Sequence, residues 1–93
     1  MFLSIIIPAL NEEQYISSTL NKIEENISKG SAYEIIVIDA GSKDRTLNIL
    51  KGFDCKVEVK TAFKGRKYES LNYGASIAKG DVLFFLDADS FVP

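Results

Sequence analysis

Four short apolar segments alternate along the chain with three amphipathic or polar segments. The apolar segments are Phe2–Ile7, Glu34–Asp39, Lys56–Lys60 and Asp81–Leu86. Residues 35–38 are all β-branched with no polar residue between them, which is typical of a strand covered on both faces. Strands that alternate with helices form parallel sheets, so the pattern predicts an α/β fold. We expect the first strand to end at Pro8, which has no N–H to donate to a neighbouring strand.

Three helices are predicted between these strands, the third over Gly65–Ala78. The side chains expected to face the sheet recur at helical spacing and are Ile16, Leu20, Ile23 and Ile27 in the first helix, Leu47, Ile49, Leu50 and Phe53 in the second, and Tyr68, Leu71, Ala75 and Ala78 in the third. Asn11 is expected to cap the first helix, and Ser42 or Asp44 the second. Glycines that commonly end helices follow each of them, at positions 30, 52 and 80.

Right-handed crossovers between the strands predict the spatial order 3-2-1-4, so that the first and fourth strands are neighbours. Ligands of open α/β sheets bind at the carboxyl ends of the strands where this order reverses. The segments Pro8–Glu13 and Asp87–Asp89 both reach that crevice, and Asp39 ends the adjacent strand. We therefore expect the carboxylates of Asp39, Asp87 and Asp89 to converge on one cleft.

Composition and charge narrow the classes of function. The 93 residues, 46% of them hydrophobic, suit one domain, and the net charge of −2 without a basic block argues against a nucleic-acid partner. No apolar run approaches the roughly 20 residues that cross a bilayer, and no basic signal start is present, so a cytosolic protein is expected. With one Cys and no His, any metal must be bound by oxygen.

Asp87-Ala88-Asp89 is the sharpest candidate for chemistry. Two carboxylates directly after an apolar strand repel each other unless a cation lies between them. Mg²⁺ and Mn²⁺ prefer oxygen ligands and keep waters and substrate phosphates, so two carboxylates suffice. A solvated turn that ends the strand explains the same tripeptide equally well.

Two further segments suit parts of a nucleotide. Asp39 could accept a hydrogen bond from a ring N–H, and Gly41 would allow close approach of the backbone, although a simple turn has the same composition. The cluster Lys64-Gly65-Arg66-Lys67 opens the third helix, where its cations and free N–H groups would suit a diphosphate. A solvated basic face is the alternative. The glycine triad of dinucleotide-binding proteins is absent, which disfavours an NAD enzyme.

Taken in order, four segments resemble the nucleotide-binding half of a family 2 glycosyltransferase with the GT-A fold. They are Ser4–Glu13, Val37–Thr46, Gly65–Asn72 with Gly74, and Leu86–Asp89. The likeness spans nearly the whole chain. It implies a Rossmann-like GT-A half-domain, with a mainly parallel sheet of about four strands in the order 3-2-1-4 and three helices.

The resemblance also implies a site for a nucleoside diphosphate sugar, with a UDP-sugar expected. In such enzymes the loop after the first strand lines the nucleoside, the acid matching Asp39 accepts from the base, and the basic residue matching Arg66 contacts the base or diphosphate. Asp87 would approach the ribose, and Asp89 with Asp87 would hold Mg²⁺ or Mn²⁺, which neutralises charge on the leaving diphosphate. The substrate-binding residues expected are Pro8, Ala9, Asn11, Glu12, Asp39, Gly41, Ser42, Arg66 and Asp87.

The length of the chain limits what the resemblance implies. The family places its acceptor-binding region and general base after the Asp-x-Asp segment, and this sequence ends four residues beyond Asp89. We expect residues 1–93 to form a single truncated donor-binding domain that is not a competent transferase alone, with no catalytic residue nominated. The apolar strand 82–86 would lie at an open sheet edge, so we expect it to form a homo-oligomer.

Two other functions stay open at this stage. Leu83–Leu86 followed by Asp87-Ala88-Asp89-Ser90 also resembles the nucleophile motif of haloacid-dehalogenase-like phosphatases. That motif normally follows the first strand and needs a downstream Lys, which argues against it here. The second alternative is a non-catalytic module that uses the same fold to bind a nucleotide or a partner subunit.

Overall fold

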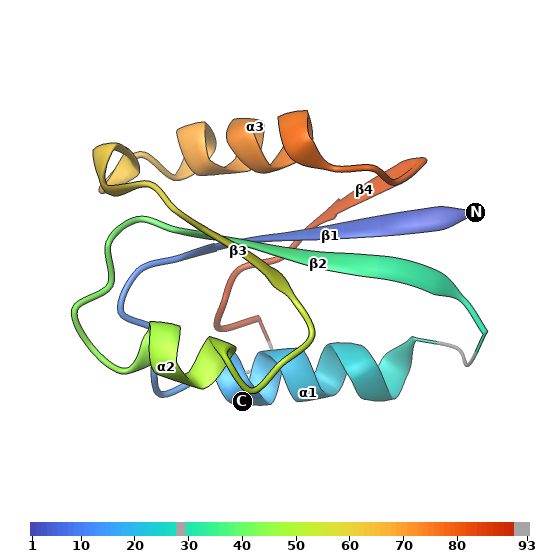
Figure 1. Ribbon diagram of the computed structural model, residues 1–93, viewed down its shortest axis with the longest axis horizontal. Coiled ribbons are helices and arrows are strands. Elements are labelled where there is room, and N and C mark those ends of the chain that lie inside the picture. Colours follow the sequence, from blue (N-terminus) through green and yellow to red (C-terminus); the bar gives the residue numbers. More distant parts are fainter. Residues whose placement is uncertain (28–29, 91–93) are drawn as a thin grey trace.

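The predicted parallel sheet is present in the computed structural model, which describes residues 1–27 and 30–90. Its strands are β1 (Phe2–Ala9), β2 (Ala32–Asp39), β3 (Lys56–Val59) and β4 (Val82–Phe85). They are all parallel and lie in the order β3-β2-β1-β4, which confirms the α/β fold and the strand order expected from right-handed crossovers. The carboxyl ends of β1, β2 and β4 therefore share one edge of the sheet (Figure 1).

Helices cover both faces of this sheet. The helices α1 (Ile16–Asn26) and α2 (Thr46–Leu50) lie on one face, and α3 (Lys67–Ile77) lies on the other (Figure 1). A short 3₁₀ helix, η1 (Thr61–Phe63), follows β3 and was not expected from the sequence. None of the helices in the described ranges has the length and apolar character needed to cross a bilayer.

The central strands contribute to a core on each face of the sheet, as their β-branched composition predicts. Alternate residues of β1 and β2, including Ile7 and Val37, pack with α1 and α2 in the larger core. Ile6, Ile36 and Ile38 are fully buried in the smaller core beneath α3. The two inner strands thus contribute buried hydrophobic residues to both cores, which stabilises the fold and fixes the sheet edge that carries the loops.

The first strand continues through Pro8 to Ala9, so the expectation that it ends at Pro8 is wrong. Pro8 is aligned with Ile38 of β2. Ile6 O accepts from Leu86 N at 3.0 Å, which places Ile6, and Pro8 two residues later, on the side that faces β4. Pairing with β4 ends at Ile6. Since β4 does not extend to Pro8, the missing N–H costs no ladder hydrogen bond.

The buried side of α3 differs from the prediction. Tyr68 is 78% exposed, whereas Ser70 and Gly74 are the buried residues of this helix. A Cβ added to Gly74 would lie 2.5 Å from Cγ2 of Ile6, so the absence of a side chain lets α3 approach the sheet closely. This contact sets the rotation of the helix and turns Tyr68 outward. Leu71, Ala75 and Ala78 pack against the core as expected.

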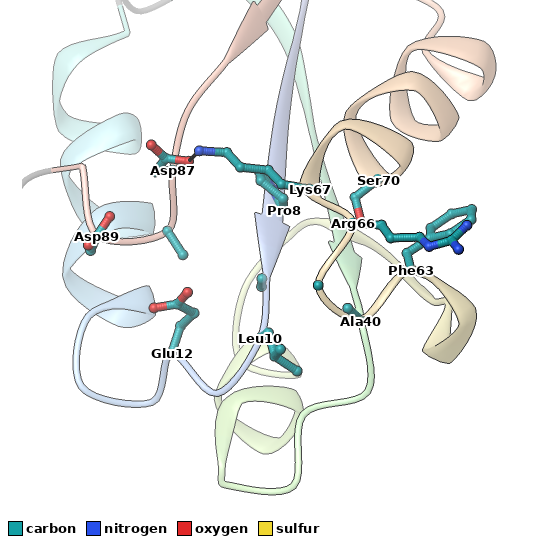
Figure 2. A pocket seen from close by; sticks show the side chains of 13 residues that line it. Pro8, Leu10, Glu12, Ala40, Phe63, Arg66, Lys67, Ser70, Asp87 and Asp89 are labelled. Carbon is teal, nitrogen blue, oxygen red and sulfur yellow. Dashed lines mark ion pairs between the residues drawn. The ribbon is translucent and has the colours of Figure 1, made fainter.

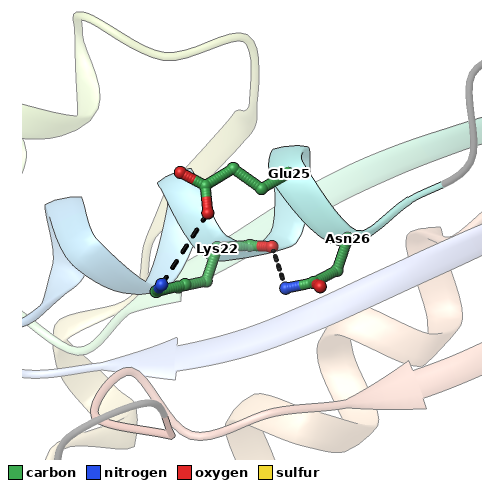
Figure 3. A network of polar contacts seen from close by, with 3 residues as sticks. All are labelled: Lys22, Glu25 and Asn26. Atoms are coloured by element: carbon green, nitrogen blue, oxygen red, sulfur yellow. Dashed lines mark hydrogen bonds and ion pairs between the residues drawn. The ribbon is translucent and has the colours of Figure 1, made fainter.

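The outward side of α1 carries weak polar contacts. Lys22 and Glu25 form an ion pair at 3.8 Å, and Asn26 Nδ2 donates to the carbonyl of Lys22 at 2.7 Å (Figure 3). An exposed pair of this kind contributes at most about 1 kcal/mol. The helix is therefore held mainly by its apolar side. It ends at Asn26, before Gly30, whose φ is +89°, and residues 28–29 lie outside the described residues.

The edge strand β4 is more exposed than its composition suggests. Its four apolar residues, Val82, Leu83, Phe84 and Phe85, are 39–50% exposed. The prediction of a strand at the open edge is thus confirmed, while whether that edge self-associates stays a prediction. Gly80 precedes β4, and a Cβ there would lie 2.8 Å from the carbonyl oxygen of Phe2, so its role is close approach to β1.

Candidate functional site

A cavity of about 450 Å³ lies where the carboxyl ends of β1, β2 and β4 meet the start of α3 (Figure 2). This is the crevice that the strand order predicted. The residues that line it are Pro8, Ala9, Leu10, Glu12, Ala40, Phe63, Gly65, Arg66, Lys67, Ser70, Asp87, Ala88 and Asp89.

Ala88 determines how the two aspartates of the last segment are presented. Leu86 N donates to Ile6 O and continues the pairing with β1 one residue past β4. Ala88 is 2% exposed in the core beside α1, and its carbonyl accepts a 2.5 Å hydrogen bond from Thr19 Oγ1. Because Ala88 is anchored in the core, Asp87 and Asp89 on either side of it line the cavity.

Glu12 adds a third carboxylate to this wall of the cavity (Figure 2). Its backbone N–H donates to Thr46 Oγ1 at 2.8 Å, which fixes the loop before α1. Burial raises the pKa of Glu12, and the negative charges of Asp89, Asp44 and Asp87 raise it further. A positive ion would relieve this repulsion. The described residues contain no group of three His, Cys, Asp or Glu able to hold a metal, so a cation here would need additional oxygen ligands from substrate or water.

Lys67 is the cation that reaches these carboxylates. Its side chain extends from the start of α3 and its Nζ forms an ion pair with Oδ1 of Asp87 (Figure 2). The hydrogen bond to Asp87 raises the pKa of Lys67. Arg66 lines the same cavity but points away from the carboxylates, to the side where Phe63 lies (Figure 2). The cavity therefore has an acidic wall, a bridging lysine and a separate arginine.

Asp39 does not share this cavity, so the expectation that three aspartates converge is wrong. Its side chain is fully buried, with Oδ2 accepting from the N–H groups of Gly41 at 2.9 Å and Ser42 at 2.7 Å. Oδ1 accepts from Ser42 Oγ at 2.5 Å. Gly41 has φ +103°, a conformation that favours glycine. In the structure Asp39 organises the turn, while the following Ala40 lines the cavity.

Asn11 connects two loops and does not cap α1, which corrects the sequence-based expectation. Its backbone has φ +54°, its N–H donates to Ser42 Oγ at 2.8 Å, and its Oδ1 accepts from Lys43 N at 2.8 Å. Arg45 is the N-cap of α2 and no N-cap side chain caps the helix, so neither Ser42 nor Asp44 stands at the predicted cap position, although Asp44 accepts from Thr46 N at 2.9 Å just before it. The loop that lines the cavity is thus held by the neighbouring loop.

The predicted site residues fall into two groups. Those that line the cavity are Pro8, Ala9, Glu12, Arg66, Asp87 and Asp89. Those that form the hydrogen-bonded network between the loops are Asn11, Asp39, Gly41 and Ser42. The sequence missed Phe63, because nothing in its pattern indicated η1. Lys67 belongs to the basic cluster that the sequence singles out, although Arg66 is the residue of that cluster that was expected to bind substrate.

Comparison with known proteins agrees with this arrangement. The model of the family described as glycosyl transferase family 2 matches residues 4–93. The glycosyltransferase AglE of Haloferax volcanii is 33% identical over 93 residues, covering 95% of this chain and 30% of AglE. The poly(ribitol-phosphate) beta-N-acetylglucosaminyltransferase TarS of Staphylococcus aureus is 28% identical over 96 residues, covering 99% of this chain and 17% of TarS. The chain thus spans less than a third of these relatives.

Solved structures show the same architecture. The crystal structure of S. aureus TarS 1–349 in complex with UDP matches with a TM-score of 0.84 and 30% identity, covering 96% of this chain and 28% of that one. Glucosyl-3-phosphoglycerate synthase from Mycobacterium tuberculosis, in complex with Mn²⁺, UDP and glucosyl-3-phosphoglycerate, matches with a TM-score of 0.76 and 30% identity, covering 92% of this chain and 33% of that one. The GT-A fold expected for this chain is therefore confirmed.

Proposed function

The chain belongs to glycosyl transferase family 2, and we propose that its cavity binds the nucleoside diphosphate of a sugar donor together with a divalent cation. The proposal rests on one observation, which is that acidic and basic side chains line different sides of the same cavity. Asp87 and Asp89 stand on one side with Lys67 reaching Asp87, and Arg66 lines the opposite side with its side chain directed toward Phe63. Carboxylates suit a hard cation and a guanidinium suits phosphate or base, so the cavity combines the groups that a metal-bound diphosphate requires.

The metal would be held by Asp89 and Asp87. Both carboxylates line the cavity beside Glu12, whose pKa is raised by burial and then further by the negative charges of Asp89, Asp44 and Asp87. Two carboxylates match Mg²⁺ or Mn²⁺, which take their remaining ligands from phosphates and water. A bound dication would neutralise the charge that develops on the leaving diphosphate. The complex of a relative with both Mn²⁺ and UDP supports a divalent cation together with the nucleotide.

The nucleoside would lie against the end of β1. Pro8, Ala9 and Leu10 supply an apolar surface there, beside Ala40. We infer a UDP-sugar as the donor, supported by the UDP complexes of two relatives. A contact between Asp39 and the base remains a prediction. It would require the Asp39 side chain, which is fully buried outside the cavity, to become accessible while its oxygens hold the 39–42 turn.

We infer that residues 1–93 bind the donor without transferring the sugar by themselves. The chain spans 30% of AglE and 17% of TarS, and no residue of the cavity is assigned as general base. The phosphatase alternative loses its support, because the family match extends over residues 4–93 and the Asp-x-Asp segment follows the fourth strand. A cytosolic location stays a prediction.

A second copy of the chain is the partner that we propose for β4. Its four side chains are exposed, and its outer edge pairs with no other strand of the described residues. Unpaired edges without charged residues commonly pair with another edge. Two copies related by a twofold axis would join their β4 strands antiparallel and cover Phe84 and Phe85.

Calorimetric titration with UDP, with and without Mn²⁺, tests the donor site. We expect binding that requires Mn²⁺ and weakens at least about tenfold in Asp89→Asn, which removes a charged metal ligand. Asp54→Asn is the matched control, since Asp54 lies outside the cavity and should bind as the parent does. No binding at millimolar UDP, or equal binding without Mn²⁺, would contradict the proposal. Magnesium-dependent hydrolysis of an aryl phosphate would favour the phosphatase instead.

A further inference from the structure

Lys67 forms an ion pair with Asp87, one of the two carboxylates that we propose as ligands of the divalent cation. Its Nζ contacts Oδ1 of Asp87, and the side chain crosses from α3 toward the acidic wall (Figure 2). Lys67 and a dication cannot both lie against the same oxygen without strong repulsion. Cation binding at Asp87 therefore requires Lys67 to move.

Little free energy is needed for Lys67 to leave Asp87. The side chains of Lys67 and Asp87 are 53% and 52% exposed, so their ion pair is screened by water and is worth little. Lysine carries a compact charge on a flexible four-carbon stem, which can exchange one acceptor for another. Lys67 also starts a helix, where a positive charge is unfavourable and an anion is favoured. Its position is thus better explained by a negative ligand than by the stability of α3.

We propose that Lys67 is an exchangeable counter-ion of the site. It neutralises Asp87 until a divalent cation binds there, and it then turns from Asp87 to the diphosphate of the nucleotide. This inference rests on the proposed donor site. Lys67 is the residue suited to the exchange, because Arg66 points away from the carboxylates toward the side of the cavity where Phe63 lies.

The exchange predicts effects of opposite sign when the charge of Lys67 is removed. In Lys67→Met, Asp87 loses its competing cation, so Mn²⁺ alone should bind about two- to fivefold more tightly. UDP in the presence of saturating Mn²⁺ should bind about tenfold more weakly, because a charge-assisted contact with the diphosphate is lost. A purely structural lysine would shift both affinities in the same direction or neither.

The experiment measures Mn²⁺ binding by electron paramagnetic resonance and UDP binding by calorimetry. Lys64→Met is the matched control, since it removes the same charge three residues away and outside the cavity, and both affinities should remain within about twofold of the parent. Lys67→Arg keeps the charge and should retain UDP binding without tighter Mn²⁺ binding. Thermal unfolding of each variant confirms that it is folded.

Three outcomes would overturn the proposal. If the parent binds UDP with Mn²⁺ but Lys67→Met binds Mn²⁺ no more tightly, Lys67 does not compete for Asp87, while the donor site stands. If neither the parent nor Lys67→Met binds Mn²⁺ alone although the parent binds UDP with Mn²⁺, freeing Asp87 does not create a cation site and the exchange fails, while the donor site stands. Only a parent that binds no UDP in the presence of Mn²⁺ removes the donor site, and the exchange with it.

Discussion

The buried hydroxyl of Thr19 donates a 2.5 Å hydrogen bond to the carbonyl of Ala88. It links the first turn of α1 to the residue between the two aspartates, across 69 positions of sequence. The position of the segment that follows β4 therefore depends on α1, in the helical layer that covers one face of the sheet. The carboxylates of the site depend on a helix that contributes no side chain to the cavity.

Thr19→Val should loosen this attachment. Valine keeps the shape of the side chain but leaves the buried Ala88 carbonyl without a partner, which costs about 1–3 kcal/mol of unfolding free energy. Urea denaturation measures that loss, and we expect the Mn²⁺-dependent affinity for UDP to fall several-fold as well. Ser18→Ala, on the exposed side of α1, should change neither quantity. Unaltered UDP binding in a destabilised Thr19→Val would show that the aspartates are positioned without this bond.

Two glycine-to-alanine substitutions should have opposite effects on stability. A Cβ at Gly74 would lie 2.5 Å from Ile6 in the buried core, so Gly74→Ala forces α3 away from the sheet. We expect a net loss of about 1–2 kcal/mol, since the cost of overpacking exceeds the gain in helix propensity. A Cβ at Gly52 would meet only Ile49 O at 3.5 Å, so Gly52→Ala should be neutral or slightly stabilising. Thermal denaturation compares them, and equal shifts would contradict the close approach.

Glu34 should make stability depend on pH. Burial acts to raise its pKa, but hydrogen bonds from Ser4 Oγ at 2.5 Å and Lys79 N at 2.7 Å lower it overall. A depressed pKa in the folded state stabilises the protein above about pH 4.3, the value for an unperturbed glutamate, and this contribution is lost as the pH falls through the folded-state pKa. The difference in unfolding free energy between the parent and Glu34→Gln should therefore be largest near neutral pH and shrink in acid. Glu24→Gln is the control, and a difference independent of pH would contradict the assignment.

The exposed edge of β4 should cause self-association. Size-exclusion chromatography with light scattering should give a dimer or larger species at micromolar concentration, and Phe84→Lys should shift it to monomer because an edge lysine opposes pairing. Val59→Lys makes the same change on the opposite edge strand, where Val59 is 49% exposed, and should leave the association intact. A monomeric parent would disprove the predicted oligomer.

The sheet could be predicted from the sequence because local pattern and general rules act together. The β-branched residues 35–38 indicated a doubly buried strand, and the handedness of crossovers placed β4 beside β1. The rotation of α3 could not be predicted, since it depends on the contact of Gly74 with Ile6 across the core. Helical spacing alone placed Tyr68 on the buried side.

The site was predictable where a residue's role follows from its position at a strand end. Asp87 and Asp89 line the cavity on either side of Ala88, which is buried in the core at the turn that follows β4. Asp39 also ends a strand, but its side chain forms hydrogen bonds with its own turn, and the sequence supports either arrangement. Phe63 enters the cavity through η1, and its position depends on packing that no local pattern encodes.

The order of the strands also determines which strand unfolds locally first. β1 and β2 are enclosed by neighbours and helices, so their amide hydrogens should exchange with deuterium most slowly, whereas β4, held along one edge, can detach while the rest stays folded. Asp87 and Asp89 follow that strand and would move with it once the hydrogen bond from Thr19 to the Ala88 carbonyl opens. A ligand that bridges these aspartates and α3 requires β4 to be paired with β1. Part of its binding free energy is therefore used to keep β4 folded. Slower deuterium uptake along β4 would then report occupancy of the cavity.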